Sequence, residues 1–285
     1  MNDVDATLEE CRRALVRWRR AFEAFTSPAT HWIVQGLAQG APLCVLDLAC
    51  GIGDPALALA AHLSPSGRVV GCDRVAPFVH ELQAYARQRG LSNLSAIQAD
   101  LECLPLAAAS VDCVVSRFGL QFCRDPAAAL AEIRRVLKPN GQTCHVVWAH
   151  ADQPLLRITV QDVLEACGSQ PFASGVPGPF QFALGGSLST QLVAAGFQDV
   201  VEQRLEQTWR WPGSAHELWR ASCDTSASLF EPLFARLTSE SRRSLDAAVI
   251  AALECFAGDN GLLIPVAVHC VWARNPNRAS SALEP

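Results

Sequence analysis

The segment VLDLACGIGDPALALA (residues 45–60) carries the strongest structural signal in this chain. It overlaps a short apolar run, 43–48, which is typical of a strand buried on both faces. The glycines of GIG (51–53) allow a tight turn, and Asp54-Pro55 suits the start of a helix, because aspartate caps helices and proline fits their first turn. The segment therefore predicts a strand, a glycine turn and a helix, which together form the repeating unit of an α/β sheet.

The same alternation continues as far as Trp148. We expect helices at 77–89 and 126–137, with a turn at 138–141, and strands at 68–72, 94–98, 111–116 and 142–148. Strands and helices that alternate through short connections predict parallel strands with helices on both faces of the sheet.

The two flanks of this region have a different pattern. A long helix at 7–38 is expected at the N-terminal side, with a break at Ser27-Pro28. Beyond Trp148, the pattern favours helices at 154–167, 188–195 and 213–257, a Pro/Gly-rich stretch at 168–186 and strands at 197–209 and 262–272. We expect the last strand to be antiparallel. The fold class is therefore α/β, with a mostly parallel seven-stranded sheet, an antiparallel C-terminal strand and a helical cap.

Composition excludes several classes of protein. With 285 residues, half of them hydrophobic and 18% charged, the chain can bury a core and is not a disordered protein. A net charge of -5 argues against nucleic-acid binding, which usually needs a basic surface. No run of about 18 apolar residues is present, so we expect no membrane span.

The cysteines favour free thiols over disulfides or a metal site. The chain has 12 cysteines but no CxxC pair, whereas zinc sites usually draw paired ligands that lie close in sequence. We therefore expect no metal, and buried thiols in a reducing compartment. The first twenty residues lack the pattern of a signal peptide, so we expect a cytoplasmic protein.

Three aspartates follow or end predicted parallel strands. Asp47 stands four residues before Gly51, where a carboxylate repels a diphosphate but attracts a cationic amino-acid ligand. Asp73 ends the second strand, the position at which nucleotide-binding α/β folds place the acid for ribose hydroxyls. Asp100 ends the third strand, where it could accept a hydrogen bond from an adenine amine. Since the carboxyl ends of parallel strands meet in one crevice, we expect a single ligand site there.

An NAD(P)-dependent oxidoreductase is the main alternative at this point. The segment GIGDPA (51–56) also fits the dinucleotide pattern GxGxxA. Three features argue against that interpretation: Asp47 ahead of the glycines, the further acid Asp100, and the expected antiparallel strand at 262–272.

A specific family resemblance strengthens the preferred interpretation. Five segments in order resemble the motifs of class I S-adenosylmethionine-dependent methyltransferases, especially those of ubiquinone and menaquinone biosynthesis: 45–60, GCD (71–73), QADLECLPL (98–106), VDCVVSRFGLQF (111–122) and EIRRVLKPNG (132–141). The resemblance covers residues 43–148 closely. It implies a Rossmann-like core and S-adenosylmethionine as cofactor. One departure is Asn140, which stands where the family usually has glycine, although asparagine also tolerates a left-handed turn.

The resemblance also implies roles for individual residues in the glycine turn. Asp47 would help to hold the ammonium end of the methionine moiety. Backbone groups around Ala49, Cys50 and Gly51 would assist it, and Gly53 would complete the cofactor-binding turn.

Residues after the next two strands would hold the nucleoside. Asp73 would bind the ribose hydroxyls, and Arg74 would cover one side of the adenine. Asp100 would accept from the adenine amine, while the Leu101 N–H would donate to a ring nitrogen.

The fourth and fifth strands would face the methyl acceptor. Ser116 and Arg117 would lie beneath the methyl donor, and Phe118 and Gln121 would face the acceptor cavity. His150, just after the fifth strand, is the first candidate for a general base; a solvent-exposed loop histidine is the equally weighted alternative. The helical cap adds aromatic side chains that would suit an apolar acceptor, unless they form the cap's own core: Phe172, Phe180, Phe182, Trp209, Trp211 and Trp219.

These interpretations give one domain with four segments. We expect a helical lid (1–40), a cofactor-binding core (41–149), the rest of the core with the helical substrate cap (150–275, the cap being 150–186 and 210–258), and a loose tail (276–285). The predicted activity is methyl transfer to a small apolar or aromatic acceptor, with oxygen or carbon favoured over nitrogen. A non-catalytic S-adenosylmethionine-binding module is a further alternative. Partners are expected to be a small molecule and, at most, a second copy of the chain.

Overall fold

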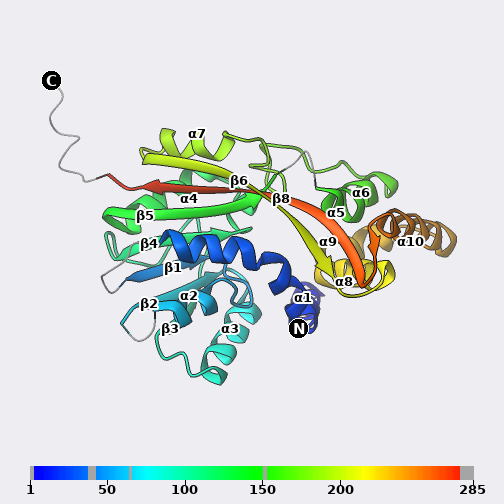
Figure 1. The fold of residues 1–285 in the computed structure, drawn as a ribbon, viewed down its shortest axis with the longest axis horizontal. Helices are drawn as coiled ribbons and strands as arrows, with labels where there is room; N and C mark the ends of the chain where they lie inside the picture. The colour runs from blue at the N-terminus through cyan, green and yellow to red at the C-terminus, as the bar shows by residue number, and fades with distance from the viewer. Residues whose placement is uncertain (1–2, 38–42, 64–65, 150–152, 277–285) are drawn as a thin grey trace. The chain divides into compact units, whose positions relative to one another are not determined.

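The computed structural model describes residues 3–37, 43–63, 66–149 and 153–276 (Figure 1). Its backbone divides into two compact units. The larger unit comprises 28–150, 174–205 and 268–285, and the smaller comprises 1–27, 151–173 and 206–267. Helix α1 (Asp3–Gly36) and strands β6 (Gln198–Trp211) and β8 (Gly261–Arg274) contribute residues to both units.

The larger unit is built around a parallel sheet. Its parallel strands lie in the spatial order β3-β2-β1-β4-β5, with bounds β1 Cys44–Leu48, β2 Arg68–Asp73, β3 Leu94–Gln98, β4 Val111–Arg117 and β5 Leu137–Trp148. Every one of these pairings is parallel. The neighbouring β8 is antiparallel to β5, with Gln142 opposite Arg274. The predicted parallel sheet with an antiparallel C-terminal strand is therefore confirmed.

Beyond β8, the described part of the sheet differs from the expectation in one respect. The sheet continues from β5 to β8 and then β6, and the two-residue strand β7 (Ala257–Gly258) also pairs with β8. This gives eight strands where seven were predicted. A two-residue strand has no detectable alternation of apolar and polar residues, which is why the sequence pattern missed it.

Helices pack on the sheet through their apolar faces. The larger unit contains α2 (Ala56–Leu63), α3 (Ala76–Gln88), α4 (Pro126–Val136) and α7 (Ser187–Ala194), together with the short 3-10 helix η1 (Leu120–Phe122). Leu130 and Ile133 of α4 and Leu192 of α7 are buried in one cluster with Leu46 and Val114 of the central strands. This packing holds the carboxyl ends of the strands in place.

The smaller unit is mainly helical. Besides part of α1 it contains α5 (Pro154–Leu156), the π-helix η2 (Arg157–Gln161), α6 (Asp162–Ala166), α8 (Ala215–Thr225), α9 (Ala227–Phe234) and α10 (Ser239–Glu254). Trp209 lies 4.8 Å from Phe25 and 5.6 Å from Trp211, and Trp211 lies 5.5 Å from Trp18, measured between ring centroids. Trp209 and Trp211 therefore contribute to an aromatic core of this unit.

The predicted break at Ser27-Pro28 is wrong, because α1 continues through Pro28. Proline at this position cannot donate to the carbonyl of Ala24, four residues earlier. The Ser27 hydroxyl donates to that carbonyl instead, at 3.3 Å. A side-chain hydroxyl thus satisfies the acceptor that proline leaves, and the helix is retained.

The predicted turn at 138–141 is part of β5 and interrupts its register. Val111 of β4 pairs with Leu137, and the next paired residue, Cys113, faces Gln142. Asn140 in this excursion has a φ of 62°, so the predicted left-handed conformation is confirmed.

Candidate cofactor site

A cavity of about 260 Å³ lies at the carboxyl ends of the parallel strands in the larger unit. Ligands in open α/β sheets bind in this crevice. Seven residues singled out from the sequence line it: Ala49, Gly51, Asp73, Arg74, Asp100, Leu101 and Phe118. Further lining residues that sequence reasoning missed include Phe78, Glu102, Gly119 and Phe122. Their common feature is that each lies a few residues beyond a strand end, where side-chain direction cannot be deduced from sequence alternation.

The two glycines of the turn after β1, Gly51 and Gly53, have different steric surroundings. Gly51 has a φ of 53°, and a Cβ atom added to it would meet nothing within 4 Å, so its open side faces free space. Gly53 has a φ of 115°, and its Cβ would lie 2.5 Å from Leu82 Cδ1. Gly51 thus leaves room at the cavity, whereas Gly53 allows the turn to pack closely on α3. Cys50, 2% exposed, lies behind the turn, and its N–H donates to the Cys72 carbonyl at 3.0 Å.

Asp73 fastens the glycine turn to the end of β2. Its Oδ2 accepts from the Gly51 N–H at 2.9 Å, and its Oδ1 accepts from the Val75 N–H at 2.9 Å. Burial raises the pKa of this carboxyl, while the hydrogen bonds from Val75 and Gly51 lower it. A carboxylate has about four lone-pair sites, so Asp73 can still accept from ligand hydroxyls in the cavity.

The segment after β3 supplies further lining residues. Asp100 Oδ1 accepts from the Glu102 N–H at 3.0 Å, and its Oδ2 lies 3.9 Å from Arg124 Nη2. Leu101 and Phe78 add apolar surface to the same cavity, which suits the faces of a purine ring.

Asp47 lies behind the cavity, fully buried. Its Oδ2 accepts from the N–H of Ala56, the first residue of α2, at 3.0 Å, while Oδ1 has no hydrogen-bond partner. Burial raises the pKa of Asp47 to about 8, with Arg117 opposing the shift and Asp54 adding to it. A cation beside the unpartnered oxygen would favour the ionised form of Asp47 and so lower its pKa. This observation fits the ammonium end of an amino-acid cofactor.

Asp54, which the sequence predicts as the cap of α2, has a buried arginine as a partner. Its carboxylate binds Arg117, whose Nη1 donates to Asp54 Oδ2 at 2.6 Å and to Thr30 Oγ1 at 2.6 Å. Asp47, nine residues ahead of Ala56, takes the N-terminal amide of α2 instead. The charge of Arg117 explains why the Asp54 carboxylate binds it, because a guanidinium at 8% exposure needs a carboxylate partner.

Two of the predicted residues serve the backbone. The Ser116 hydroxyl donates to the Leu48 carbonyl at 3.0 Å and accepts from the Leu120 N–H at 3.1 Å, which ties β4 to β1. Gln121 is fully buried, and its Oε1 accepts from the Trp148 N–H at 3.2 Å. Neither side chain is among those that line the cavity, and neither is that of Arg117.

Phe118 forms an aromatic wall of the cavity. It has a φ of 60°, and its ring stacks on Trp148 with centroids 4.1 Å and planes 14° apart. Phe122, 49% exposed, lines the same cavity. The neighbouring Gly119 approaches the glycine turn so closely that a Cβ atom there would lie 2.3 Å from Ala49 Cβ.

Of the two histidines in or just after β5, the structure describes one. His150 lies outside the described residues. His145 is fully buried in β5; its Nε2 lies 2.8 Å from Thr143 Oγ1, and burial lowers its pKa to about 3.

Within the described ranges, no group of three or more His, Cys, Asp or Glu side chains is arranged to hold a metal ion. In the same ranges, no helix combines the length and apolar character needed to cross a bilayer.

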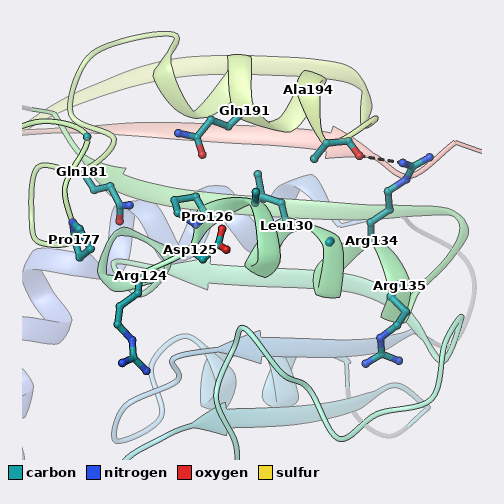
Figure 2. A pocket seen from close by; sticks show the side chains of 14 residues that line it. Arg124, Asp125, Pro126, Leu130, Arg134, Arg135, Pro177, Gln181, Gln191 and Ala194 are labelled. Carbon is teal, nitrogen blue, oxygen red and sulfur yellow. Dashed lines mark hydrogen bonds between the residues drawn. The ribbon is translucent and has the colours of Figure 1, made fainter.

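A second, larger cavity of about 1010 Å³ lies between α4 and α7 (Figure 2). Arg134 Nη1 donates to the Ala195 carbonyl at 3.0 Å across one end of it. Figure 2 shows Arg124 and Arg135 extending away from Gln191 of α7. The charged side chains therefore do not converge on one point in this cavity.

Comparison with known proteins agrees with the geometry of the smaller cavity. Residues 45–141 match the model of a methyltransferase domain. Demethylmenaquinone methyltransferase of Lactiplantibacillus plantarum is 32% identical over 189 residues, which cover 61% of this chain and 80% of the relative. This chain belongs to the class I S-adenosylmethionine-dependent methyltransferase family. The family's methyl donor is S-adenosylmethionine, so the comparison decides against the NAD(P)-dependent oxidoreductase.

Two further comparisons show how far the likeness extends. A malonyl-[acyl-carrier protein] O-methyltransferase of Methylovorus is 40% identical over 109 residues, 37% of this chain and 36% of the relative. The solved YcgJ protein of Bacillus subtilis has 19% identity and a TM-score of 0.55, covering 88% of this chain and 99% of that one, and so shares the fold. Apart from the Lactiplantibacillus enzyme, the curated relatives compared are spanned over only 33% to 47% of their length.

Proposed function

We propose that this methyltransferase-family chain transfers the methyl group of S-adenosylmethionine to a small apolar acceptor, at oxygen or carbon in preference to nitrogen. The observation that carries the proposal is the cavity at the carboxyl ends of β1 to β4, which is lined by both acidic and aromatic side chains. The acidic side chains suit a cationic, ribose-containing cofactor, and the aromatic rings suit an apolar acceptor.

The acidic side chains would hold the cofactor. Asp73 would accept the ribose hydroxyls, because its two oxygens already anchor the turn and retain free lone pairs. Asp100 would accept from the adenine amine, with Phe78 and Leu101 against the ring. Asp47 would attract the ammonium group from behind the glycine turn through its unpartnered Oδ1.

The rings of Phe118 and Phe122 would receive the acceptor. Phe118 and Phe122 present apolar rings to the cavity, and the Phe118 ring is held by its stack on Trp148. The names of two relatives indicate a menaquinone precursor and an acyl-carrier-bound malonyl group as their acceptors. Both names support a biosynthetic acceptor for this chain, methylated at carbon or oxygen.

The protein's contribution to the reaction would be mainly orientation. S-adenosylmethionine supplies a methyl group on a sulfonium, so no nucleophile is required from the chain. The residues around the cavity would align the acceptor with the methyl group and exclude water, and proximity of this kind accounts for much of the acceleration in such reactions. We propose His150 as the general base for an oxygen acceptor. The lid (1–40) and helical cap (150–186 and 210–258) remain predictions.

Calorimetry and product analysis test the proposal together. The purified protein is titrated with S-adenosylmethionine, S-adenosylhomocysteine and NAD, and is then incubated with S-adenosylmethionine and a panel of phenols, quinols and amines. We expect micromolar binding of the two adenosyl ligands and methylation of a phenol or quinol. Binding of NAD alone contradicts the proposal, and adenosyl binding with no methylated product favours a non-catalytic module.

His150 has a separate test. His150→Ala should lower turnover of an oxygen acceptor most strongly below neutral pH and leave S-adenosylmethionine affinity unchanged. Full turnover of the variant at every pH shows that His150 is not the base.

A further inference from the structure

A cavity of about 400 Å³ lies within the smaller unit, where α1, α8, α9 and α10 contribute to its lining. Among the described residues, none lines both this cavity and the candidate cofactor site. Arg13 and Arg17 of α1 line it one helical turn apart, and so do Phe230 and Phe234 of α9. A volume of this size is in the range of small-molecule sites. The cavity therefore has the dimensions of a further ligand site.

Two aromatic rings form part of the apolar surface of this cavity. Phe230 and Phe234 stack on each other, with centroids 5.3 Å and planes 16° apart. The buried side chains of Ala14 and Ala227 also line the cavity and are too small to fill it. The lining therefore suits the flat apolar body of an aromatic ligand.

Arg242 is held in one orientation at the same cavity. Its Nε donates to the two carboxylate oxygens of Asp246 at 2.9 and 3.0 Å, and its guanidinium carbon lies 3.6 Å from the centroid of the Phe234 ring. Its Nη2 lies 3.9 Å from Cys223 Sγ, whereas its Nη1 has no hydrogen-bond partner among the described residues. A guanidinium fixed by a carboxylate and a ring has its remaining donors oriented in advance for an oxygen ligand.

Arg13 and Arg17 lack close carboxylate partners. Arg13 Nε lies 3.9 Å from Glu9 Oε1, an oxygen that Arg12 binds at 2.6 Å. In the part of the chain that the structure describes, Arg17 forms no ion pair, and its guanidinium lies 5.1 Å from the ring centroid of Trp18. Like charges one turn apart on a helix repel each other, so an anion bound by these side chains would relieve the repulsion.

Three carboxylates also line the cavity, and two of them already accept hydrogen bonds. Asp224 Oδ2 accepts from Trp18 Nε1 at 3.3 Å. Glu231 Oε2 accepts from Thr7 Oγ1 at 3.3 Å. The third, Glu10, is exposed. The arginines therefore have more unused donors than the carboxylates have unused acceptors, which favours an anionic ligand.

We propose that this cavity binds a small aromatic carboxylate, with the ring against Phe230 and Phe234 and the carboxylate bound by Arg17 and Arg242. Arginine is suited to this task because its planar fork matches the two oxygens of a carboxylate. The site goes beyond the proposed methyl transfer and does not depend on it, because its lining residues differ from those of the cofactor cavity.

Calorimetry with three probes tests the chemistry of the site. The full-length protein is titrated with 1-naphthoate, with 1-naphthalenemethanol, which has the ring without the charge, and with acetate, which has the charge without the ring. We expect one molecule of 1-naphthoate to bind, and each of the other probes to bind at least about tenfold more weakly. Equal affinity for 1-naphthoate and 1-naphthalenemethanol, or no heat of binding with 1-naphthoate at millimolar concentration, overturns the proposal.

Substitutions of arginine test the location. Arg17→Met and Arg242→Met should each weaken 1-naphthoate binding by at least about tenfold. The matched controls are Arg20→Met on α1 and Arg243→Met on α10, which remove an exposed arginine from the same helices outside the cavity and should leave the affinity unchanged. Arg17 is itself exposed, so Arg17→Met gives the comparison even if loss of the Asp246 contact prevents Arg242→Met from folding. Affinities of the Arg17→Met and Arg20→Met proteins that are equal contradict the proposed site.

A competition experiment separates this site from the cofactor cavity. Saturating S-adenosylhomocysteine should not displace 1-naphthoate, and Arg74→Met, which alters the lining of the cofactor cavity, should not change its affinity. Displacement, or loss of binding in Arg74→Met, places the probe in the cofactor cavity and overturns the inference. Binding of 1-naphthoate that depends on Arg17, in a protein with no affinity for S-adenosylmethionine, supports this site and contradicts the proposed function alone.

Discussion

The rings of Phe118 and Trp148 are stacked at 4.1 Å, one at the end of β4 and the other at the end of β5. Phe118 has a φ of 60°, a left-handed conformation that costs a non-glycine residue roughly 1–2 kcal/mol. Strained residues of this kind concentrate at binding and catalytic sites. Phe118 also lines the cavity, so the strained backbone lies at the candidate site.

Two substitutions of Phe118 should separate the contribution of its ring from the cost of its left-handed backbone. Both Phe118→Ala and Phe118→Gly lose the stack, worth about 0.5–1.5 kcal/mol beyond buried area. The glycine variant should nevertheless be more stable than the alanine variant by about 1 kcal/mol, because glycine adopts the left-handed conformation freely. Both should weaken acceptor binding and leave S-adenosylmethionine affinity nearly unchanged. Chemical denaturation and calorimetry measure these effects; equal stability of the two variants would show that Phe118 is not strained.

The two glycines of the turn should respond differently to alanine. Gly51→Ala adds a methyl group where no atom lies within 4 Å, so folding should lose only about 1–2 kcal/mol for the left-handed φ. Its affinity for S-adenosylmethionine should fall at least about tenfold, which corresponds to 1.4 kcal/mol, because the methyl group occupies ligand space. Calorimetry and thermal melting measure both quantities.

Gly53→Ala should destabilise the fold more than Gly51→Ala does. The new Cβ would collide with Leu82 Cδ1 at 2.5 Å, so the variant should lose about 1–3 kcal/mol from overpacking in addition to the cost of its φ. A Gly53→Ala protein as stable as Gly51→Ala contradicts the assignment of these two roles.

Asp47→Asn should stabilise the ligand-free protein at neutral pH. The pKa of Asp47 is raised from 3.8 to about 8 in the folded state, so the unfolded chain gives up its proton first. The stability associated with Asp47 is therefore complete below pH 4 and is lost as pH rises toward 8. The melting temperature of Asp47→Asn relative to wild type should increase from pH 5 to pH 8, while cofactor binding is lost. Asp259→Asn, an exposed carboxylate, is the control and should show no such trend.

His145→Gln should reduce sensitivity to acid. Burial lowers the pKa of His145 from 6.5 to about 3, so below pH 6.5 the unfolded chain takes up a proton that the folded protein does not. The wild type therefore loses stability as pH falls from 6.5 toward 3, and the glutamine variant lacks this contribution. Glutamine can still bond Thr143. Thermal melting between pH 4 and 7 should show a flatter profile for His145→Gln than for His62→Gln, in which an exposed histidine is replaced.

The sequence predicted which strand ends contribute to the cavity, but it did not predict the hydrogen bonds of Arg117. Asp73 and Asp100 were expected at the cavity and lie there, because the end of a strand follows from the local pattern of apolar residues. The partners of Arg117 were missed. Thr30 and Asp54 are 87 and 63 residues away, and no local periodicity connects them to Arg117.

At the start of α2 the structure also uses an aspartate that local capping rules do not identify. Asp54-Pro55 has the usual pattern of a helix start, yet Asp47 accepts the N–H of Ala56. Capping rules describe an isolated helix, whereas here a buried guanidinium competes for the nearer carboxylate and a strand brings the farther one into place.

By itself, the sequence determined the strand–turn–helix order, the parallel core, the family and the acids at the ends of β2 and β3. These features depend on the spacing of apolar residues, glycines and carboxylates over short segments, where hydrophobic burial and backbone freedom act locally. Only the tertiary structure decided that Ser116 ties β4 to β1, that Arg117 binds Asp54 and Thr30, and that Phe118 stacks on Trp148. The physical reason is that buried polar and charged groups take whichever partner the packed sheet brings within hydrogen-bonding distance.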